Sequence, residues 1–170
     1  MKDRIVNKML KKHLVDFSTI IFIFLIDRVS KLLIISSPET YEQYGISITS
    51  FLNFNLIWNE GIAFGLFSFD EKFYYNLLTI IICIVILIII WLMLKSKGFE
   101  KISFLLIIGG SIGNIYDRIY YSAVPDFIDI HFNNYHWFIF NVADIFITLG
   151  IVFLICIEIF GSKKQKNENY

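Results

Sequence analysis

The sequence predicts an all-α membrane protein with four transmembrane helices and a small extracytoplasmic β-platform. Its 170 residues are 56% hydrophobic and only 18% charged, which is too apolar for an ordinary soluble domain. Four apolar stretches approach the length of about 20 residues that a helix needs to cross a membrane. Two segments between these stretches alternate apolar and polar residues in the manner of strands. Because the chain has the length of one domain, we expect residues 1–170 to form a single integral-membrane domain.

The four predicted spans cover about residues 15–35, 73–94, 102–120 and 138–160. The second span is the clearest, since no charged residue occurs between Leu77 and Leu94. The first span follows a basic segment, as the apolar part of a signal peptide would. It nevertheless carries Asp27, Arg28 and Lys31 and has no small-residue cleavage site. We therefore interpret it as a span that remains part of the protein.

The distribution of lysine and arginine predicts the orientation of the spans. The loop at residues 36–72 has only Lys72, and the loop at residues 121–137 has none. Because basic flanks stay in the cytoplasm, we expect both termini and the middle loop there, and these two loops outside. The net charge of zero gives no reason to expect a nucleic acid partner. The basic flanks contain Lys2, Arg4, Lys8, Lys11, Lys12, Lys95, Lys97, Lys101, Lys163, Lys164 and Lys166.

Both outer loops contain predicted strands. In the stretch FLNFNLIWNE, apolar residues at positions 52, 54, 56 and 58 alternate with asparagines at 53, 55 and 59. The preceding stretch ISITS is its expected hairpin partner. The stretch FIDIHFNN alternates in the same way, with Ile128, Ile130 and Phe132 as its apolar members. These strands are expected to form a small platform at the outer membrane boundary.

The polar residues of the spans and outer loops are expected to meet at one level, in the outer leaflet. The third span runs outward. The fourth runs inward from Phe138, so its first polar residues lie about one to two turns below the surface at roughly 1.5 Å per residue. Asp126 lies in the short connection between these two spans. The full set of candidate site residues is Asp27, Lys31, Asn59, Asn114, Arg118, Asp126, Asn141 and Asp144.

Helical spacing groups several of these residues on shared faces. Residues three or four positions apart are neighbours on a helix, which pairs Asn141 with Asp144, Asn114 with Arg118, and Asp27 with Lys31. The last pair either neutralises itself as a structural tie or belongs to the site. Asp117 lies roughly 100° around the helix from Arg118, so we expect it to face elsewhere with a structural role. The GxxxG spacing of Gly109 and Gly113 indicates close helix packing.

Two aspartates suggest a reaction. An aspartate at the centre of a bilayer costs about 2.5–3.5 kcal/mol, so an acid in a span is a functional candidate. Two close carboxylates in a low dielectric do not both ionise easily, and a pair that shares one proton can activate a water. Asp126 and Asp144 are the candidate pair. The alternative reading of Asp126 is a solvated loop acid, and Asp129 is interpreted as an ordinary strand residue.

Other catalytic chemistries are less well supported by the sequence. His131 and His136 do not form an HExxH motif, so we expect no zinc site and interpret both as interface or loop residues. Cys83 and Cys156 each sit in an apolar run without CxxC spacing, and we interpret them as buried small hydrophobes. No GxSxG motif is present for a serine nucleophile.

Five short blocks, in order along the chain, resemble the bacterial lipoprotein signal peptidases, also called signal peptidase II. They are DRVSK in the first span, NEGIAF in the first outer loop, GNIYDR in the third span, VPDFID after it, and FNVADIFI at the start of the fourth. Each block is weak alone, but together they cover nearly the whole chain. The first block departs from the family at Arg28 and Ser30, where a neutral polar residue and threonine are more usual.

The resemblance implies a specific reaction and a set of site residues. Such enzymes are aspartic endopeptidases that cut the signal peptide from diacylglyceryl-modified prolipoproteins just before the lipidated cysteine. By motif, Asp126 and Asp144 would be catalytic, and Asn59, Asn114, Arg118, Asn141, Asp27 and Lys31 would support them. The resemblance further implies the bacterial cytoplasmic (inner) membrane, a site toward its outer face, contact with membrane lipid, and no metal or organic cofactor. We also expect a monomer.

A small polytopic transporter or proton relay is the alternative function, because aspartate and asparagine within a membrane also serve there. Four spans without an internal repeat are few for alternating access. A relay would also need polar residues through both leaflets, whereas the inner half of the predicted spans has almost none besides Glu158. A purely structural membrane subunit is a further alternative. Such a subunit would not need the aspartate of FNVAD to lie opposite the aspartate of VPDF.

Overall fold

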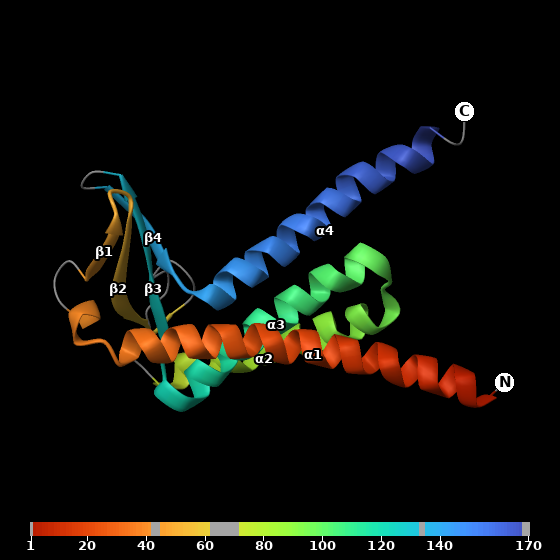
Figure 1. Cartoon of the computed structure of the whole chain (residues 1–170), viewed down its shortest axis with the longest axis horizontal. Coiled ribbons are helices and arrows are strands. Elements are labelled where there is room, and N and C mark those ends of the chain that lie inside the picture. Colours follow the sequence, from red (N-terminus) through yellow and green to blue (C-terminus); the bar gives the residue numbers. More distant parts are fainter. Residues whose placement is uncertain (1, 42–44, 62–71, 133–134, 168–170) are drawn as a thin grey trace.

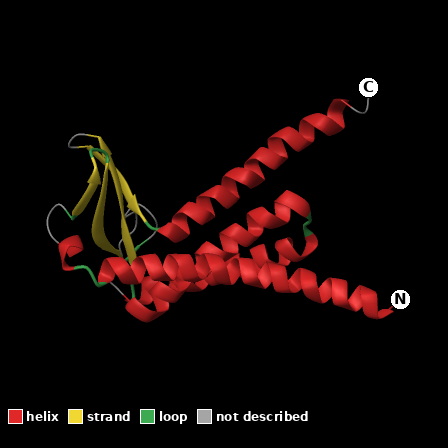
Figure 2. Cartoon of the chain, viewed as in Figure 1, coloured by secondary structure: helices red, strands yellow, loops and turns green. Residues whose placement is uncertain are grey.

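The computed structural model describes residues 2–41, 45–61, 72–132 and 135–167. Within these ranges the chain forms the helices α1 (Lys2–Ile35), α2 (Lys72–Lys95), α3 (Gly98–Tyr121) and α4 (Val142–Asn167). A short 3-10 helix, η1 (Pro38–Tyr41), follows α1. The strands are β1 (Ile46–Thr49), β2 (Leu52–Asn59), β3 (Val124–Phe132) and β4 (Tyr135–Phe140). Figure 2 shows the strands gathered at one end of the helices.

Helix α3 is the centre of the helical part, since it packs against α1, α2 and α4 and most of it is buried. Small residues allow this close packing. A Cβ at Gly109 would lie 2.8 Å from the Ile23 Cβ, and one at Gly113 would lie 2.4 Å from the Asp27 Oδ2. The packing predicted from the GxxxG spacing is therefore confirmed. In Figure 1, α1 begins and α4 ends on the side of the molecule away from the sheet.

Among the described residues, three helical segments are long and apolar enough to cross a membrane: Tyr75–Lys95, Gly98–Tyr121 and Val142–Phe160. These correspond to the second, third and fourth predicted spans. The first predicted span is helical throughout, but α1 carries Asp16, Asp27, Arg28 and Lys31 and is not among these three segments. The mostly helical architecture with a small antiparallel sheet agrees with the predicted fold class.

The sheet has the order β1-β2-β3-β4, and all neighbouring strands are antiparallel. The stretch ISITS does form the hairpin partner of β2, and FIDIHFNN supplies most of the described part of β3, so both strand predictions are confirmed. A buried cluster of Ile34, Leu56 and Phe127 fixes the sheet against the end of α1. The sheet is therefore held rigidly where β3 approaches the helices.

The predicted start of the fourth span was wrong. Residues 138–140 belong to β4, and α4 begins only at Val142. The apolar sequence of Phe138, Ile139 and Phe140 suits a strand as well as a helix, and pairing with β3 decides the matter, since Ile128 lies opposite Phe140. Asn141 therefore precedes α4 and Asp144 lies in its first turn, not one to two turns along the helix.

The helices expose wide apolar surfaces, as expected for contact with lipid. On α2, Ile80, Ile84 and Leu87 are all more than half exposed. Cys83 and Cys156 are free thiols, but they are not buried in protein as the sequence suggested: Cys83 is half-buried and Cys156 is exposed on α4. Their apolar neighbours along the sequence form a surface, so an apolar run alone did not indicate a protein core.

Candidate active site

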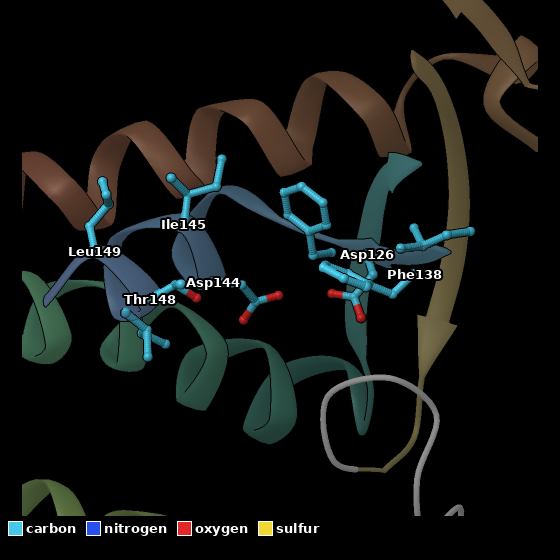
Figure 3. A pocket seen from close by; sticks show the side chains of 9 residues that line it. Asp126, Phe138, Asp144, Ile145, Thr148 and Leu149 are labelled. Atoms are coloured by element: carbon cyan, nitrogen blue, oxygen red, sulfur yellow. The ribbon is translucent and has the colours of Figure 1, made fainter. Parts of the chain in front are cut away.

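Asp126 and Asp144 lie together where β3 meets the first turn of α4. Their carboxylates point toward the same space in Figure 3. Both residues line two neighbouring cavities of about 460 Å³ and about 210 Å³. The larger cavity is otherwise mostly apolar, with Phe138, Ile139, Phe140, Ile145, Ile147, Thr148 and Leu149. The smaller one is more polar, with Asn59, Ile82, Ser111, Asn114, Arg118, Val124, Asn141 and Ile147.

Asp126 is positioned by the turn that ends α3 and by the sheet. Ser122 adopts a left-handed conformation (φ 57°), which ends the helix and leads the chain into β3. The antiparallel pairing of β3 with β2 brings Asn59 to the same end of the sheet. The Asn59 Nδ2 donates to the Asp126 Oδ2 at 2.9 Å, and the Asn141 Nδ2 donates to its Oδ1 at 2.6 Å. Asp126 is 4% exposed, so it is not the solvated loop acid considered as an alternative.

Asp144 is held by the start of α4 in a reciprocal capping arrangement. Asn141 precedes the helix, and its Oδ1 accepts a hydrogen bond from the Asp144 backbone N at 3.0 Å. The Asp144 Oδ2 in turn accepts from the Asn141 backbone N at 3.1 Å. This is a capping box built from Asn and Asp, and the helix dipole favours a carboxylate at this end. The side chains of Asn141 and Asp144 thus interact through the cap, not as two residues of one helical face.

Asn114 of α3 links the aspartates to a buried cluster of charges. Its Nδ2 donates to the Asp144 Oδ1 at 2.8 Å, and its Oδ1 accepts from the Lys31 Nζ at 2.8 Å. The Lys31 Nζ also donates to the Asp27 Oδ2 at 2.8 Å and the Asp117 Oδ2 at 2.7 Å. The predicted neutralisation of Asp27 by Lys31 is therefore confirmed, within a larger cluster.

Asp117 has the structural role expected of it, since it lines neither of the two cavities. It is fully buried against α1, where it pairs with both Lys31 and Arg28. The two cations and the two anions, Asp27 and Asp117, balance in charge, as burial of ionised groups requires. Arg28 also lies over the ring of Tyr116, with 5.0 Å between its Cζ and the ring centroid. The partner on another helix could not be read from the position of Asp117 on α3 alone.

Asp27 also anchors the helix that carries Asp144. Its Oδ1 accepts a hydrogen bond at 2.9 Å from the backbone N of Ala143, one of the unpaired N–H groups at the start of α4. Asp27 also packs directly against Gly113 of α3, where a Cβ would collide with the Asp27 carboxylate. The charged cluster therefore fixes the first turn of α4 relative to α1 and α3.

Arg118 supplies a positive charge beside the two aspartates. Its Nη2 donates to the Gly61 carbonyl oxygen at 3.1 Å, and its Nη1 donates to the Asn114 carbonyl oxygen at 3.3 Å. It lines the smaller cavity together with Asp126 and Asp144. Among the described residues no carboxylate forms an ion pair with it. Its charge is therefore available to a group that develops negative charge in the cavity.

The environment of Asp126 favours its protonated form. Burial, and then the nearby Asp144 carboxylate, raise the pKa of Asp126 from 3.8 to about 6. The hydrogen bonds from Asn59 and Asn141 and the charge of Lys31 act in the opposite direction. Close carboxylates with unequal surroundings are the pattern expected of a pair that shares one proton.

Asp129, His131 and His136 form a separate group on the β3–β4 hairpin. Asp129 is 1% exposed, and its Oδ2 lies 2.8 Å from the His136 Nδ1. The strand role predicted for Asp129 is confirmed, but no local pattern indicated its histidine partner. These are also the described residues whose donor atoms could together hold a metal ion.

Comparisons with known proteins agree with this geometry. The profile of the signal peptidase (SPase) II family matches residues 19–160. The chain belongs to the signal peptidase II family. It is therefore a peptidase of a membrane-protein family, as the resemblance implied.

Individual relatives support the same assignment. The chain is 51% identical over 159 residues to the lipoprotein signal peptidase of Pelagibacter ubique (strain HTCC1062), covering 94% of this chain and 96% of that one. It is 42% identical over 133 residues to the enzyme of the same name from Francisella tularensis subsp. novicida (strain U112), covering 75% and 83%. A solved bacterial membrane enzyme, determined by the in meso method at 2.3 Å resolution, superposes with a TM-score of 0.75 at 26% identity, covering 88% of this chain and 90% of that one.

Proposed function

We propose that this chain is an intramembrane aspartic endopeptidase that removes the signal peptide from diacylglyceryl-modified prolipoproteins. Asp126 and Asp144 are its catalytic pair, and the cut falls before the lipidated cysteine. Membership of the signal peptidase II family supports signal-peptide removal from prolipoproteins. The single observation that carries the mechanism is that both carboxylates line the same cavities and are held there by amide groups of Asn59, Asn114 and Asn141.

The chemistry follows from the different surroundings of the two acids. We assign the shared proton to Asp126, because its pKa is raised to about 6, and the role of base to Asp144. Asp144 takes a proton from a water molecule while the oxygen of that water attacks the scissile carbonyl. Asp126 gives its proton to the carbonyl oxygen. The intermediate collapses when the proton on Asp144 passes to the leaving amine and Asp126 takes back a proton from a hydroxyl of the intermediate, which restores the starting pair. Arg118 counters the negative charge of the cavity during these steps.

The supporting residues act by position. Asn59 and Asn141 orient the Asp126 carboxyl, while Asn114 orients Asp144. Asp27 and Lys31 touch neither carboxylate of the pair. They act through the backbone of Ala143 and the side chain of Asn114. Their proposed role is to keep the start of α4 in register with β3.

We further infer that α1 is a fourth span and that both termini are cytoplasmic. At roughly 1.5 Å per residue, its 34 residues exceed the hydrocarbon thickness of about 30 Å. The charges of Asp27, Arg28 and Lys31 are neutralised against each other and Asp117, which lowers the cost of burying them at membrane level. The distribution of basic residues supports this orientation, with the sheet outside. The membrane is the bacterial inner membrane, and the enzyme works as a monomer.

The apolar cavity suggests how the substrate reaches the site. Phe138, Phe140, Ile145 and Leu149 form its wall next to the two aspartates. A lipid-modified peptide can approach through the bilayer and keep its acyl chains in apolar surroundings. This placement explains why a peptidase would have an apolar cavity beside a polar pair.

A proton relay would need polar groups along the whole membrane path. The other buried ion pair among the described helices, Asp16 with Lys101, joins α1 and α3 closer to the start of α1. Between this pair and the charged cluster lie the buried side chains of Ile23, Ile107 and Ile108, together with the hydroxyl groups of Ser103 and Ser111. Because the described helices have no buried ionisable group in this interval, the structure favours a peptidase over a relay.

The purified full-length chain should be incubated with a diacylglyceryl-modified prolipoprotein and, separately, with the same protein left unmodified. Mass spectrometry should find a product that begins at the lipidated cysteine, formed faster by orders of magnitude than from the unmodified protein. Loss of cleavage in the Asp126→Asn variant ties the product to the proposed pair. Absence of cleavage by a folded wild-type chain would refute the proposal, and equal rates on both substrates would refute the outer-leaflet route.

A further inference from the structure

Three side chains on the β3–β4 hairpin form a group of potential metal ligands apart from the aspartate pair. Asp129 and His131 come from β3, and His136 comes from β4. One donor atom from each can be chosen so that all three lie within 4.8 Å of one another. The Asp129 side chain is 1% exposed, whereas that of His136 is 54% exposed. The group therefore has a buried carboxylate at its base and an imidazole that is open to solvent.

A β-bulge brings these residues together. Ile130 lies opposite Phe138, but His131 lies opposite His136, so Trp137 is an extra residue on β4. Bulges of this kind redirect side chains. Although Asp129 pairs along the backbone with Ile139, its carboxylate oxygens lie 3.0 Å and 2.8 Å from the His136 Nδ1. The rings of His131 and His136 stack with 5.2 Å between their centroids.

Two buried polar atoms beside this group have no hydrogen-bond partner in the described part of the chain. They are the His131 Nδ1 and the Oδ1 of Asn53 on β2, the residue directly opposite Asp129. Buried polar atoms are nearly always paired, so two unpaired ones next to a carboxylate and an imidazole require an explanation. A bound cation would satisfy an imidazole nitrogen and attract an amide oxygen.

We propose that Asp129, His131 and His136 bind a divalent transition-metal ion of the zinc type. Two imidazoles with one carboxylate suit Zn²⁺ or Co²⁺, whereas Mg²⁺ and Ca²⁺ prefer sets of oxygen ligands. Zinc takes four ligands at about 2.0–2.2 Å, so its donors lie roughly 3.3 Å apart. The donors of this group lie within 4.8 Å of one another, so binding requires the two imidazoles to rotate toward the ion. The fourth position is filled by water or by the Asn53 amide oxygen.

The bound ion joins β3 to β4 and stabilises the hairpin. Strand β3 carries Asp126, and β4 carries Phe138 and Phe140, which line the apolar cavity. The ion therefore holds the wall of the cavity in place and takes no part in peptide cleavage. The sequence led us to expect no metal, and this proposal departs from that expectation at a site that is independent of the reaction.

Metal binding can be measured on the full chain in detergent after treatment with EDTA and its removal. The wild type should bind one Co²⁺ per chain with a visible absorption spectrum, and Zn²⁺ should displace it. Zn²⁺, but not Mg²⁺, should raise the thermal unfolding midpoint. His131→Gln and His136→Gln should each weaken Co²⁺ binding at least about tenfold, the lower limit for loss of an outer-shell partner. His13→Gln, which removes the remaining histidine of the chain, should bind as the wild type does.

The metal-free proteins supply the control for folding. Because His136 is largely exposed, the stripped His136→Gln variant should unfold within a degree or two of the stripped wild type. The proposal is overturned if the stripped wild type binds no Co²⁺ at micromolar concentration, which leaves only the Asp129–His136 hydrogen bond. It is also overturned if His131→Gln and His136→Gln bind Co²⁺ as tightly as the wild type and show the same Zn²⁺-dependent shift.

Discussion

Two pairs of aspartates lie close together in this protein, and their partners differ. Asp27 and Asp117 contact the cations Lys31 and Arg28, and the whole cluster is buried and balanced in charge. Asp126 and Asp144 accept hydrogen bonds only from amide groups among the described residues, and both face cavities. Asn114 connects the charged cluster to the catalytic pair, since it accepts a hydrogen bond from Lys31 and donates one to Asp144.

The difference separates a structural role from a reactive one. A carboxylate paired with a buried cation is held in its ionised form and its oxygens are occupied. A carboxylate held by neutral amides keeps its position but not a fixed charge, so it can exchange a proton. The charged cluster therefore positions the helices, while the amide-held pair retains the ability to act as acid and base.

The largest expected effect is on turnover. Asp126→Asn and Asp144→Asn should each lower single-turnover cleavage at least about a hundredfold, because each removes a group that holds or accepts the shared proton. The double variant should be hardly slower than either one, since residues that act as a unit are not additive. Glu158→Gln makes the same kind of change on the exposed surface of α4 and should leave the rate unchanged. A near-normal rate for Asp144→Asn would exclude the aspartic mechanism.

The next effect is on stability, and it concerns the charged cluster. Lys31→Met leaves Asp27 and Asp117 buried with too little positive charge, which should cost about 3–5 kcal/mol of unfolding free energy. Lys12→Met, at an exposed position of the same helix, α1, should change stability by less than about 0.5 kcal/mol. Denaturant unfolding in one detergent compares the two variants with the wild type. Equal small losses would mean that the cluster is not a structural tie.

A smaller effect concerns pH. The pKa of Asp126 is raised from 3.8 to about 6 in the folded chain, so the contribution of this group to stability is fully present below pH 3.8 and is lost as the pH rises to 6. The stability of Asp126→Asn relative to the wild type should therefore increase over this interval, by about 1.4 kcal/mol per pH unit. Unfolding of both proteins at pH 4.5 and pH 7.5 measures the change. A difference that does not vary with pH contradicts the raised pKa.

The smallest effect is expected away from both pairs. Replacing Cys83 and Cys156 together by alanine removes two free thiols, neither of which lines either of the two cavities. Cleavage should continue at the wild-type rate. Inactivation at normal protein levels would point to thiol chemistry and remove the reason for assigning reactivity to the amide-held pair.

The sequence identified the aspartate pair, the strands of the outer loops and most of each helix. These features are encoded locally. A strand alternates every second residue, a span needs a run of apolar residues, and an acid among apolar neighbours stands out wherever it occurs. Asp126 and Asp144 were candidates for this reason before their proximity was known.

The tertiary structure decided which residues face each other. The start of α4 depended on pairing of β4 with β3, because the apolar run from Phe138 fits a strand or a helix equally well. The partners of Asp117 lie on another helix, and the contact depends on how α1 and α3 rotate against each other. A β-bulge brought His136 to Asp129. Neighbours along the chain fix local periodicity, but helix rotation and strand register depend on contacts between segments far apart in sequence, which no local pattern contains.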